Sequence, residues 1–223
     1  MTLDLVFLGF NDAGKEIYDW LVQQEEVDVR ALITTKKQLE LVKEIQPDIA
    51  VSVGYRHIVP KEIIEIPERG ILNLHPSYLP YGRGANPNVW SIVDDNPAGV
   101  TLHFMDEDLD TGEIIAQERV EKKFSDTGKD LHKRLEKAQV ELFKENWPDI
   151  LENSIETESQ KNEESTYHRS AEFNELCKLD LNEKYRVEEF INILRALTFP
   201  PYENAYVEKN GEKYYIEINI EKE

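Results

Sequence analysis

The sequence predicts an α/β fold built on a mostly parallel sheet with helices on both faces. Short apolar runs rich in β-branched and aromatic residues alternate with segments whose apolar residues recur at helical spacing. Residues 3–9 are the first such run, and residues 13–24 are the first helical segment, with Ile17, Trp20 and Leu21 on one face. Strands that are apolar along their whole length and separated by helices are typical of parallel sheets buried on both faces.

The same alternation continues as far as residue 120. Further strands are expected at residues 27–34, 49–53, 70–74, 99–105 and 113–120, and helices at 38–44, 60–66 and 86–93. Ser125 or Thr127 can cap a longer helix with an apolar stripe made by Leu131, Leu135, Ala138 and Leu142. The short stretch between residues 27 and 49 indicates a trimmed Rossmann-like sheet.

A polar, acidic stretch without periodicity separates this domain from the C-terminal part of the chain. We expect one domain over residues 1–150, a linker over 151–164 and a small α+β appendage over 165–223. The appendage includes a helix over residues 187–197. It ends in a β-hairpin, because Asn210-Gly211 separates two β-prone runs. Apolar residues alternate with polar ones over residues 214–220, so one face of the hairpin is expected to be buried.

Length, composition and charge favour a cytoplasmic protein. With 223 residues, 40% of them hydrophobic, the chain can bury a full core, yet no apolar run is long enough to span a membrane. Asp4 interrupts the first apolar run without a basic region before it, so a core strand is expected there rather than a signal peptide. Cys177 is the one cysteine, which favours a reducing compartment. The net charge of −19 argues against a nucleic acid partner, and it fits either a solubility surface or a salt-rich cytoplasm.

The first segment that points to chemistry lies at the end of an expected strand, in residues 73–80. Asn73 and His75 are separated by Leu74, so their side chains lie on the same side of the strand. Ligands of open α/β sheets bind at such strand ends. A lone histidine beside a core strand is often structural, but this pair at the start of a proline-bounded loop favours a positioned catalytic site.

A second segment, residues 99–112, ends in an acidic loop. Four carboxylates lie within five positions, those of Asp106, Glu107, Asp108 and Asp110. Like charges this close raise one another's pKa unless they point apart or meet cations. A solvated loop and a hard-metal site both stay open on this ground, but the spacing does not match a calcium-binding loop, so no metal is expected.

Four short motifs, taken together, resemble the folate-dependent formyltransferase family. They are Asn-x-His-Pro-Ser at residues 73–77, Arg83-Gly84, Gly-Val-Thr-x-His at 99–103 and Asp-x-Gly at 110–112, and the close match covers residues 51–117. The resemblance implies that residues 1–150 form the catalytic domain. It also implies that Asn73, His75 and Asp110 form the catalytic set.

The resemblance further implies N10-formyltetrahydrofolate as the formyl donor. The backbone of residues 54–58 is similar to the segment that surrounds the pterin ring in this family, and the acidic loop is similar to the one that faces the other edge of the ring. The residues expected at the donor are Tyr55, Arg56, His57, Ile58, Asp106, Glu107 and Asp108.

The catalytic groups indicate direct transfer without a covalent enzyme intermediate. When a neutral amine attacks the formyl carbon, negative charge develops on the formyl oxygen, and the Asn73 amide and a protonated His75 can donate hydrogen bonds to it. Asp110 can hold the charge of His75 and orient a water that carries the proton from the amine to N10. His103 is expected either to support this set or to be structural.

The C-terminal part of the chain is similar to the sugar-nucleotide branch of the family. There, this part helps to bind the nucleotide and to build a dimer. The resemblance therefore implies a dTDP- or UDP-linked amino sugar as acceptor, a homodimer, and no membrane partner. The residues expected at the nucleotide are Tyr167, His168, Arg169, Arg195, Phe199 and Tyr202, through stacking on a base or contact with a diphosphate. Phe199 packed in a corner and Arg195 anchoring its helix are the structural alternatives.

Other activities of the family stay open. Methionyl-tRNA formyltransferases carry a larger C-terminal domain and a basic surface, whereas this chain is acidic. Glycinamide ribonucleotide formyltransferases have a Gly-Ser-Asn-type loop after the first strand, where this chain has Gly9-Phe10-Asn11. Formyltetrahydrofolate hydrolases share the catalytic set but usually carry a separate N-terminal regulatory domain, which is not expected here. A folate-binding relative without activity is disfavoured because all three catalytic residue types are present.

Overall fold

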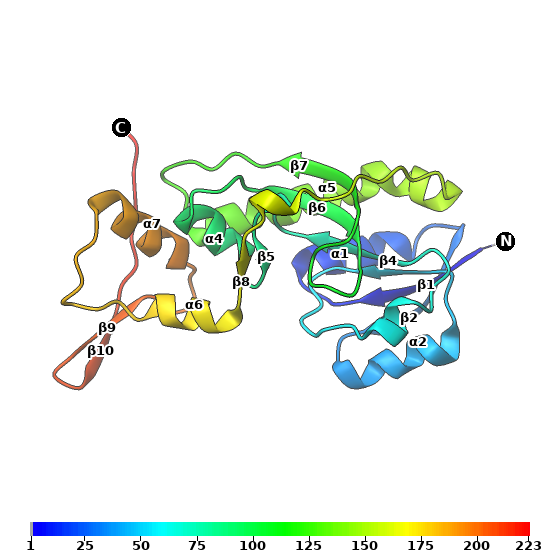
Figure 1. Ribbon diagram of the computed structural model, residues 1–223, viewed down its shortest axis with the longest axis horizontal. Helices are drawn as coiled ribbons and strands as arrows, with labels where there is room; N and C mark the ends of the chain where they lie inside the picture. The colour runs from blue at the N-terminus through cyan, green and yellow to red at the C-terminus, as the bar shows by residue number, and fades with distance from the viewer. Residues whose placement is uncertain (1) are drawn as a thin grey trace. The chain divides into compact units, whose positions relative to one another are not determined.

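The computed structural model describes residues 2–223 and confirms the α/β fold (Figure 1). Its helices and strands, in chain order, are β1 (Leu3–Leu8), α1 (Asp12–Leu21), β2 (Val27–Ile33), η1 (Lys36–Leu39), α2 (Glu40–Ile45), β3 (Ile49–Ser52), α3 (Lys61–Ile64), β4 (Ile71–His75), β5 (Arg83–Gly84), α4 (Pro87–Val93), β6 (Gly99–Phe104), β7 (Ile114–Arg119), α5 (Gly128–Glu152), η2 (Asn162–Glu164), β8 (Tyr167–His168), α6 (Ser170–Cys177), α7 (Val187–Leu197), β9 (Tyr206–Lys209) and β10 (Glu212–Tyr215).

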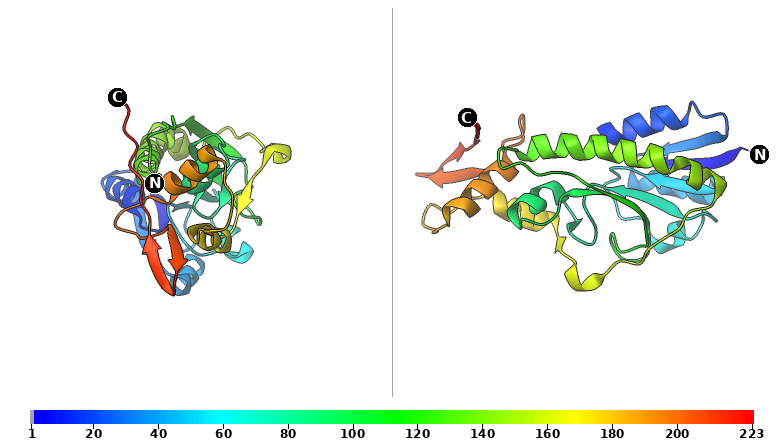
Figure 2. Two further views of the ribbon diagram at one scale, coloured as in Figure 1. Left: turned by 90° about the vertical axis from the view of Figure 1, so that its left-hand side faces the viewer. Right: turned by 90° about the horizontal axis from the view of Figure 1, so that it is seen from above.

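The chain folds into two compact units, and the polypeptide passes between them more than once. Unit 1 contains the chain up to His75, Val100–Glu118 and Glu136–Lys161. Unit 2 contains Pro76–Gly99, Arg119–Leu135 and Asn162–Glu223. The long helix α5 is continuous, as Figure 2 shows, with its first residues in unit 2 and the rest in unit 1.

A six-stranded sheet with the order β2-β1-β3-β4-β6-β7 forms the centre of unit 1. Strands β1 to β4 are parallel, and β6 runs antiparallel to β4. All residues of β3 are buried, as expected of a strand covered on both faces. The carboxyl ends of the parallel strands meet at one edge of the sheet. At this edge β4 ends with His75, and the chain leaves β3 towards residues 54–58.

Helices cover both faces of this sheet, which confirms the layered arrangement. On one face, α2 and α3 contribute Val42 and Ile63 to a core cluster with residues of β1 and β3. On the other face, the ring of Phe7 meets the ring of Tyr18 in α1 at a centroid distance of 5.7 Å. Each fully buried aliphatic or aromatic side chain stabilises the fold by about 1.5–3 kcal/mol. These layers therefore hold the strand ends in fixed positions.

Unit 2 contains two small paired elements. The two-residue strands β5 and β8 pair in parallel, with Arg83 opposite Tyr167. The hairpin of β9 and β10 confirms the predicted turn: Asn210 and Gly211 both have positive φ, 54° and 83°.

Two details of unit 2 differ from the expectation. The strand β10 ends at Tyr215, and Tyr214 is 49% exposed, so the prediction that this residue belongs to a buried face is wrong. Ile216, Ile218 and Ile220 are partly buried and alternate with exposed residues as predicted. Outside the hairpin, the backbone N–H of Ile218 donates to the hydroxyl of Thr198.

Candidate active site

The end of β4 places two of the candidate residues side by side. Asn73 and His75 are two positions apart in the strand, so they share a face, and His75 is buried. In the antiparallel pairing with β6, Asn73 lies opposite His103 and His75 lies opposite Thr101. The register of the sheet therefore places His103 beside Asn73 and His75.

A tight loop between β6 and β7 brings Asp110 to the same place. The backbone of Asp110 has a φ of 56°, a left-handed conformation that few residues other than glycine adopt. At Gly112 the loop lies so close to β6 that an added Cβ would be 1.9 Å from the carbonyl oxygen of Phe104. This fold back on the sheet directs the Asp110 side chain towards the ends of β4 and β6.

The Asp110 carboxylate lies among three nitrogen atoms. Its Oδ1 atom is 3.8 Å from Nδ1 of His75, 3.9 Å from Nε2 of His103 and 3.5 Å from Nδ2 of Asn73. The side chains of His75 and Asp110 are 8% and 9% exposed. The structure thus brings together the three residues predicted as the catalytic set, in a site largely shielded from water; their catalytic role stays a prediction.

His103 determines which way the Asn73 amide points. The Nδ1 atom of His103 lies 2.7 Å from the backbone carbonyl oxygen of Phe104, which only accepts, so Nδ1 carries the proton and donates it. The Nε2 atom is then an acceptor, and the Nδ2 amide nitrogen of Asn73, 3.1 Å away, donates to it. Burial lowers the pKa of His103 to about 4 despite the opposing charge of Asp110, so the ring stays neutral near pH 7.

This depressed pKa predicts a pH dependence of stability. Between pH 4 and pH 6.5 the unfolded chain protonates His103 while the folded chain does not, so the free energy of unfolding falls as the pH is lowered through this window. The loss from this one group is expected to reach roughly 3 kcal/mol. Urea unfolding at a series of pH values, for the wild type and for His103→Gln, measures it. A shallower pH slope in His103→Gln is expected, and equal slopes would contradict the assignment.

The segment expected to contact the formyl donor, residues 54–58, follows β3 and is exposed to solvent apart from the half-buried Tyr55. Tyr55 is fixed, because its hydroxyl donates to the carbonyl oxygen of Thr35 at 3.2 Å and its ring contacts His57. Burial raises the pKa of the Tyr55 phenol. Arg56 and His57 are exposed, and Ile58 is 78% exposed. A large apolar side chain left in solvent beside a strand end suits contact with a flat ring.

In the acidic loop, the side chain of Asp106 is hydrogen-bonded within the loop, whereas Glu107 and Asp108 point into solvent. The Asp106 carboxylate accepts from the Thr111 hydroxyl at 2.5 Å and from the Asp108 backbone N–H at 3.2 Å, so this carboxylate shapes the loop itself. Glu107 and Asp108 are exposed. Lys61, at the start of α3, forms an ion pair of 2.8 Å with Glu107 and so links the segment after β3 to this loop. Lys61 is not among the residues expected from the sequence, although its position directly after Pro60, close to residues 54–58, is a usable signal.

The residues expected at the nucleotide, all in unit 2, differ in their freedom to bind. Tyr167 is 48% and Tyr202 is 63% exposed, and Arg169 is also exposed. His168 is engaged: its ring stacks on Trp90 at 3.8 Å, and its two nitrogens lie 2.7 and 2.8 Å from carboxylates of Glu172 and Asp94. Phe199 is partly buried and contacts the rings of His132 and Tyr202.

The placement of Arg195 favours the structural alternative, in which it anchors its helix, over contact with a diphosphate. Its side chain is 5% exposed, and its guanidinium donates to the backbone carbonyls of Lys123 and Asp126 and to the side chain of Asn192. Burial lowers the pKa of Arg195, opposed by the nearby charge of Asp126. The helical spacing of α7 turns this arginine towards the protein interior, so it anchors the helix and is not available to a ligand.

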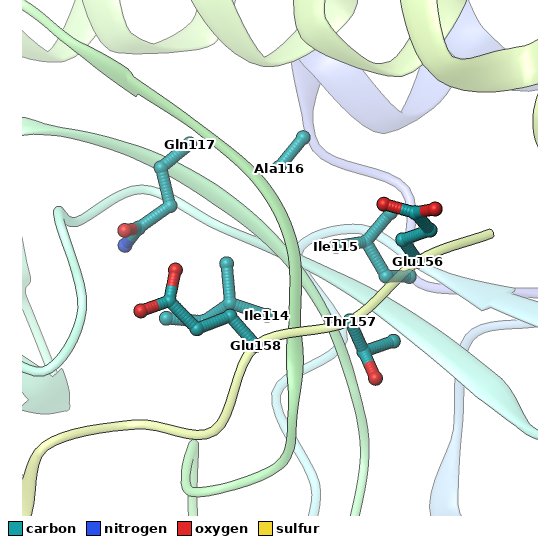
Figure 3. Close-up of a pocket in the computed structure, with 7 residues that line it drawn as sticks. All are labelled: Ile114, Ile115, Ala116, Gln117, Glu156, Thr157 and Glu158. Carbon is teal, nitrogen blue, oxygen red and sulfur yellow. The ribbon is translucent and has the colours of Figure 1, made fainter.

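Among the described residues 2–223, no cluster of three or more histidine, cysteine or acidic side chains is arranged to hold a metal ion. No helix in that range is long and apolar enough to cross a membrane. A hollow of about 340 Å³ lies between β7 and residues 156–158, and Figure 3 shows the residues that line it. None of the candidate catalytic residues lines it.

Two family descriptions match the chain. The description "Formyl transferase" matches residues 11–146, and "N-formyltransferase dimerization C-terminal domain" matches residues 172–222. Methionyl-tRNA formyltransferase of Clostridium tetani is 34% identical over 177 residues, which are 79% of this chain and 56% of that protein. The dTDP-4-amino-4,6-dideoxyglucose formyltransferase of Mycobacterium tuberculosis is 36% identical over 68% of this chain and 65% of that protein. The chain thus spans less than two thirds of the length of these two relatives.

Solved structures of formyltransferases have the same fold. A 4-N formyltransferase from Francisella tularensis is 28% identical, with a TM-score of 0.88 over 99% of this chain and 98% of that one. The formyltransferase PseJ from Anoxybacillus kamchatkensis, in complex with UDP-4,6-dideoxy-4-formamido-L-AltNAc and tetrahydrofolate, is 34% identical, with a TM-score of 0.68 over 77% of this chain and 88% of that one.

Proposed function

The chain belongs to the formyl transferase family, and we propose that it transfers a formyl group from N10-formyltetrahydrofolate to the amine of a nucleotide-linked amino sugar. The observation that carries this proposal is the buried group of Asn73, His75 and Asp110, with the Asn73 amide oriented by a neutral His103. Hydrogen-bond donors fixed in a shielded site stabilise a developing negative charge better than donors that must first reorient.

Each residue of the site has a role that its contacts support. The Asn73 amide donates one proton to His103 at 3.1 Å and directs the other towards Oδ1 of Asp110 at 3.5 Å. The second, longer bond is the one that the formyl oxygen would replace as charge develops there. The imidazole of His75 donates to the same oxygen, and the carboxylate of Asp110 lies 3.8 Å from its Nδ1 atom. Asp110 also orients the water that moves a proton from the acceptor amine to the departing nitrogen of the folate.

The formyl donor is proposed to lie at the carboxyl edge of the sheet. Residues 54–58 offer the exposed Ile58 and backbone groups of a segment held by Tyr55. Glu107 and Asp108 lie in the acidic loop. The Lys61–Glu107 ion pair links this loop to α3, which follows residues 54–58. The complex of the relative PseJ with tetrahydrofolate supports a folate at this family's site.

A sugar nucleotide is the proposed acceptor because two observations favour it over tRNA. The matches in the C-terminal part are to a dimerization domain of N-formyltransferases and to a 4-N formyltransferase that is covered almost completely. The net charge of −19 opposes binding of a polyanionic RNA. The exposed rings of Tyr167 and Tyr202 are proposed to contact the nucleotide, and a cytoplasmic homodimer is the proposed state.

Methionyl-tRNA is the second candidate acceptor, favoured by the 34% identity with the Clostridium tetani enzyme. An assay with N10-formyltetrahydrofolate and separate acceptors distinguishes the two. The acceptors are dTDP- and UDP-linked amino sugars with the amine at different ring positions, methionyl-tRNA and glycinamide ribonucleotide. Tetrahydrofolate release with a mass gain of one formyl group on a nucleotide sugar is expected. Formylation of methionyl-tRNA alone would overturn the sugar proposal, and folate release without any acceptor would indicate a hydrolase.

A further inference from the structure

The segment that follows α5 is attached to the start of β7. Ile114 and Glu158 form an antiparallel bridge with two backbone hydrogen bonds of 2.8 Å. The hydroxyl of Thr157 donates to the Glu113 carboxylate at 2.7 Å. Figure 3 shows Glu156, Thr157 and Glu158 on this segment, beside the strand that carries Ile114. These residues lie in the stretch expected to be a linker, and the polar sequence pattern gives no sign of this attachment to β7.

This attachment brings Gln160 to the loop that carries Asp110. The Nε2 atom of Gln160 lies 3.0 Å from the backbone carbonyl oxygen of Asp110 and 2.8 Å from that of Gly112, and it donates to both. An amide nitrogen has two protons, so both are used on this loop. One side chain therefore holds the backbone carbonyls of both Asp110 and Gly112.

The backbone that Gln160 holds has an unfavourable conformation at Asp110. Asp110 is in the left-handed region, which costs a residue other than glycine of the order of 1 kcal/mol or more. The preceding residues 106–109 are exposed and contribute little packing. The position of the Asp110 carboxylate relative to His75 depends on this backbone conformation, and a misplacement of about 1 Å in an active site can cost about 100-fold in rate.

We propose that Gln160 is a positioning residue that sets the distance between the Asp110 carboxylate and the ends of β4 and β6. The proposal rests on the proposed formyl transfer for its kinetic test. It also has a structural test that needs no turnover.

The kinetic test compares Gln160→Ala, Gln160→Glu and the control Thr157→Val. Gln160→Glu keeps the size of the side chain but has no proton to donate at neutral pH, so it removes both hydrogen bonds without leaving a space, whereas Gln160→Ala removes the bonds and the side chain together. Both Gln160 variants are expected to lower kcat about 10–100-fold with KM for the folate changed less than about threefold. Thr157→Val removes a hydrogen bond between the same attached segment and the side chain of Glu113 but leaves the backbone carbonyls of Asp110 and Gly112 untouched, and is expected to stay within about twofold of the wild type.

A double-mutant cycle separates positioning from a general structural effect. If Gln160 acts through the Asp110 carboxylate, Gln160→Ala lowers kcat much less in an Asp110→Asn background than in the wild type. An equal loss in both backgrounds would overturn the proposal.

The activity-independent test uses the side-chain amide resonances of Asn73, whose Nδ2 lies 3.5 Å from Oδ1 of Asp110. In ¹⁵N spectra these resonances are expected to shift in Gln160→Ala and to stay in place in Thr157→Val. If the Asn73 resonances do not move in Gln160→Ala, Gln160 does not position Asp110, whatever the protein transfers. If they move but no acceptor is formylated, the proposed function fails and the positioning role stands.

Discussion

Replacement of Asp110 by asparagine is expected to lower kcat for formyl transfer by about 10²–10⁴-fold, the range typical of lost acid–base groups. The asparagine side chain keeps the size of the aspartate and fits the same space, which is only 9% exposed. It removes the negative charge 3.8 Å from Nδ1 of His75 and the acceptor for a proton in transfer. Initial rates of tetrahydrofolate release at saturating substrates measure this effect, and KM for the folate is expected to change less than about threefold.

The control for this prediction is Glu118→Gln. Glu118 is an exposed carboxylate on β7 of the same unit, so the variant changes net charge by the same amount without touching the site. Its kcat is expected to match that of the wild type. If Asp110→Asn retains more than about a tenth of the wild-type kcat, the carboxylate has no part in proton transfer.

Local sequence patterns were sufficient to predict most of unit 1. The inner strands β1 and β3 are apolar along almost their whole length because both faces are covered, and this pattern is visible without any knowledge of partners. The helix α7 was predicted with its bounds, since its apolar residues keep a helical period up to the break at Phe199. The helix α6 was missed, because a short helix with one buried residue, Cys177, leaves almost no periodic signal.

The site could be predicted only as far as strand periodicity and motif resemblance reach. Periodicity places Asn73 and His75 on one face, and the motifs add Asp110. The role of Gln160 depends on hydrogen bonds to residues 48 and 50 positions away in the sequence. The role of Arg195 depends on hydrogen bonds to residues 69 and 72 positions away. Such contacts are products of the tertiary fold and have no local pattern. The proton on Nδ1 of His103 likewise follows from a carbonyl that only the folded strand presents.

Replacement of Asn73 by alanine is expected to lower kcat by about 10²–10³-fold, as is typical when one donor to a developing oxyanion is removed. The physical reason is specific to this site, because His103 accepts one amide proton at 3.1 Å and the second is held only by a longer bond of 3.5 Å to Asp110, which a formyl oxygen can replace. The loss is expected in kcat rather than in KM, since the bond strengthens as charge develops on the formyl oxygen. Rates of tetrahydrofolate release over a range of folate concentrations separate the two constants.

The matched control is Asn146→Ala. The Asn146 amide lies on α5 in the same unit and donates to the backbone carbonyl of Leu142, so its removal deletes an amide of the same kind away from the site. This control is expected to keep kcat within about twofold, since its hydrogen bond contributes only about 1 kcal/mol to stability. A tenfold rise in KM with unchanged kcat in Asn73→Ala would mean that the amide binds the folate equally in the ground state. Asn73 would then lose its assignment as an oxyanion donor, and His75 would be left as the remaining donor to the formyl oxygen.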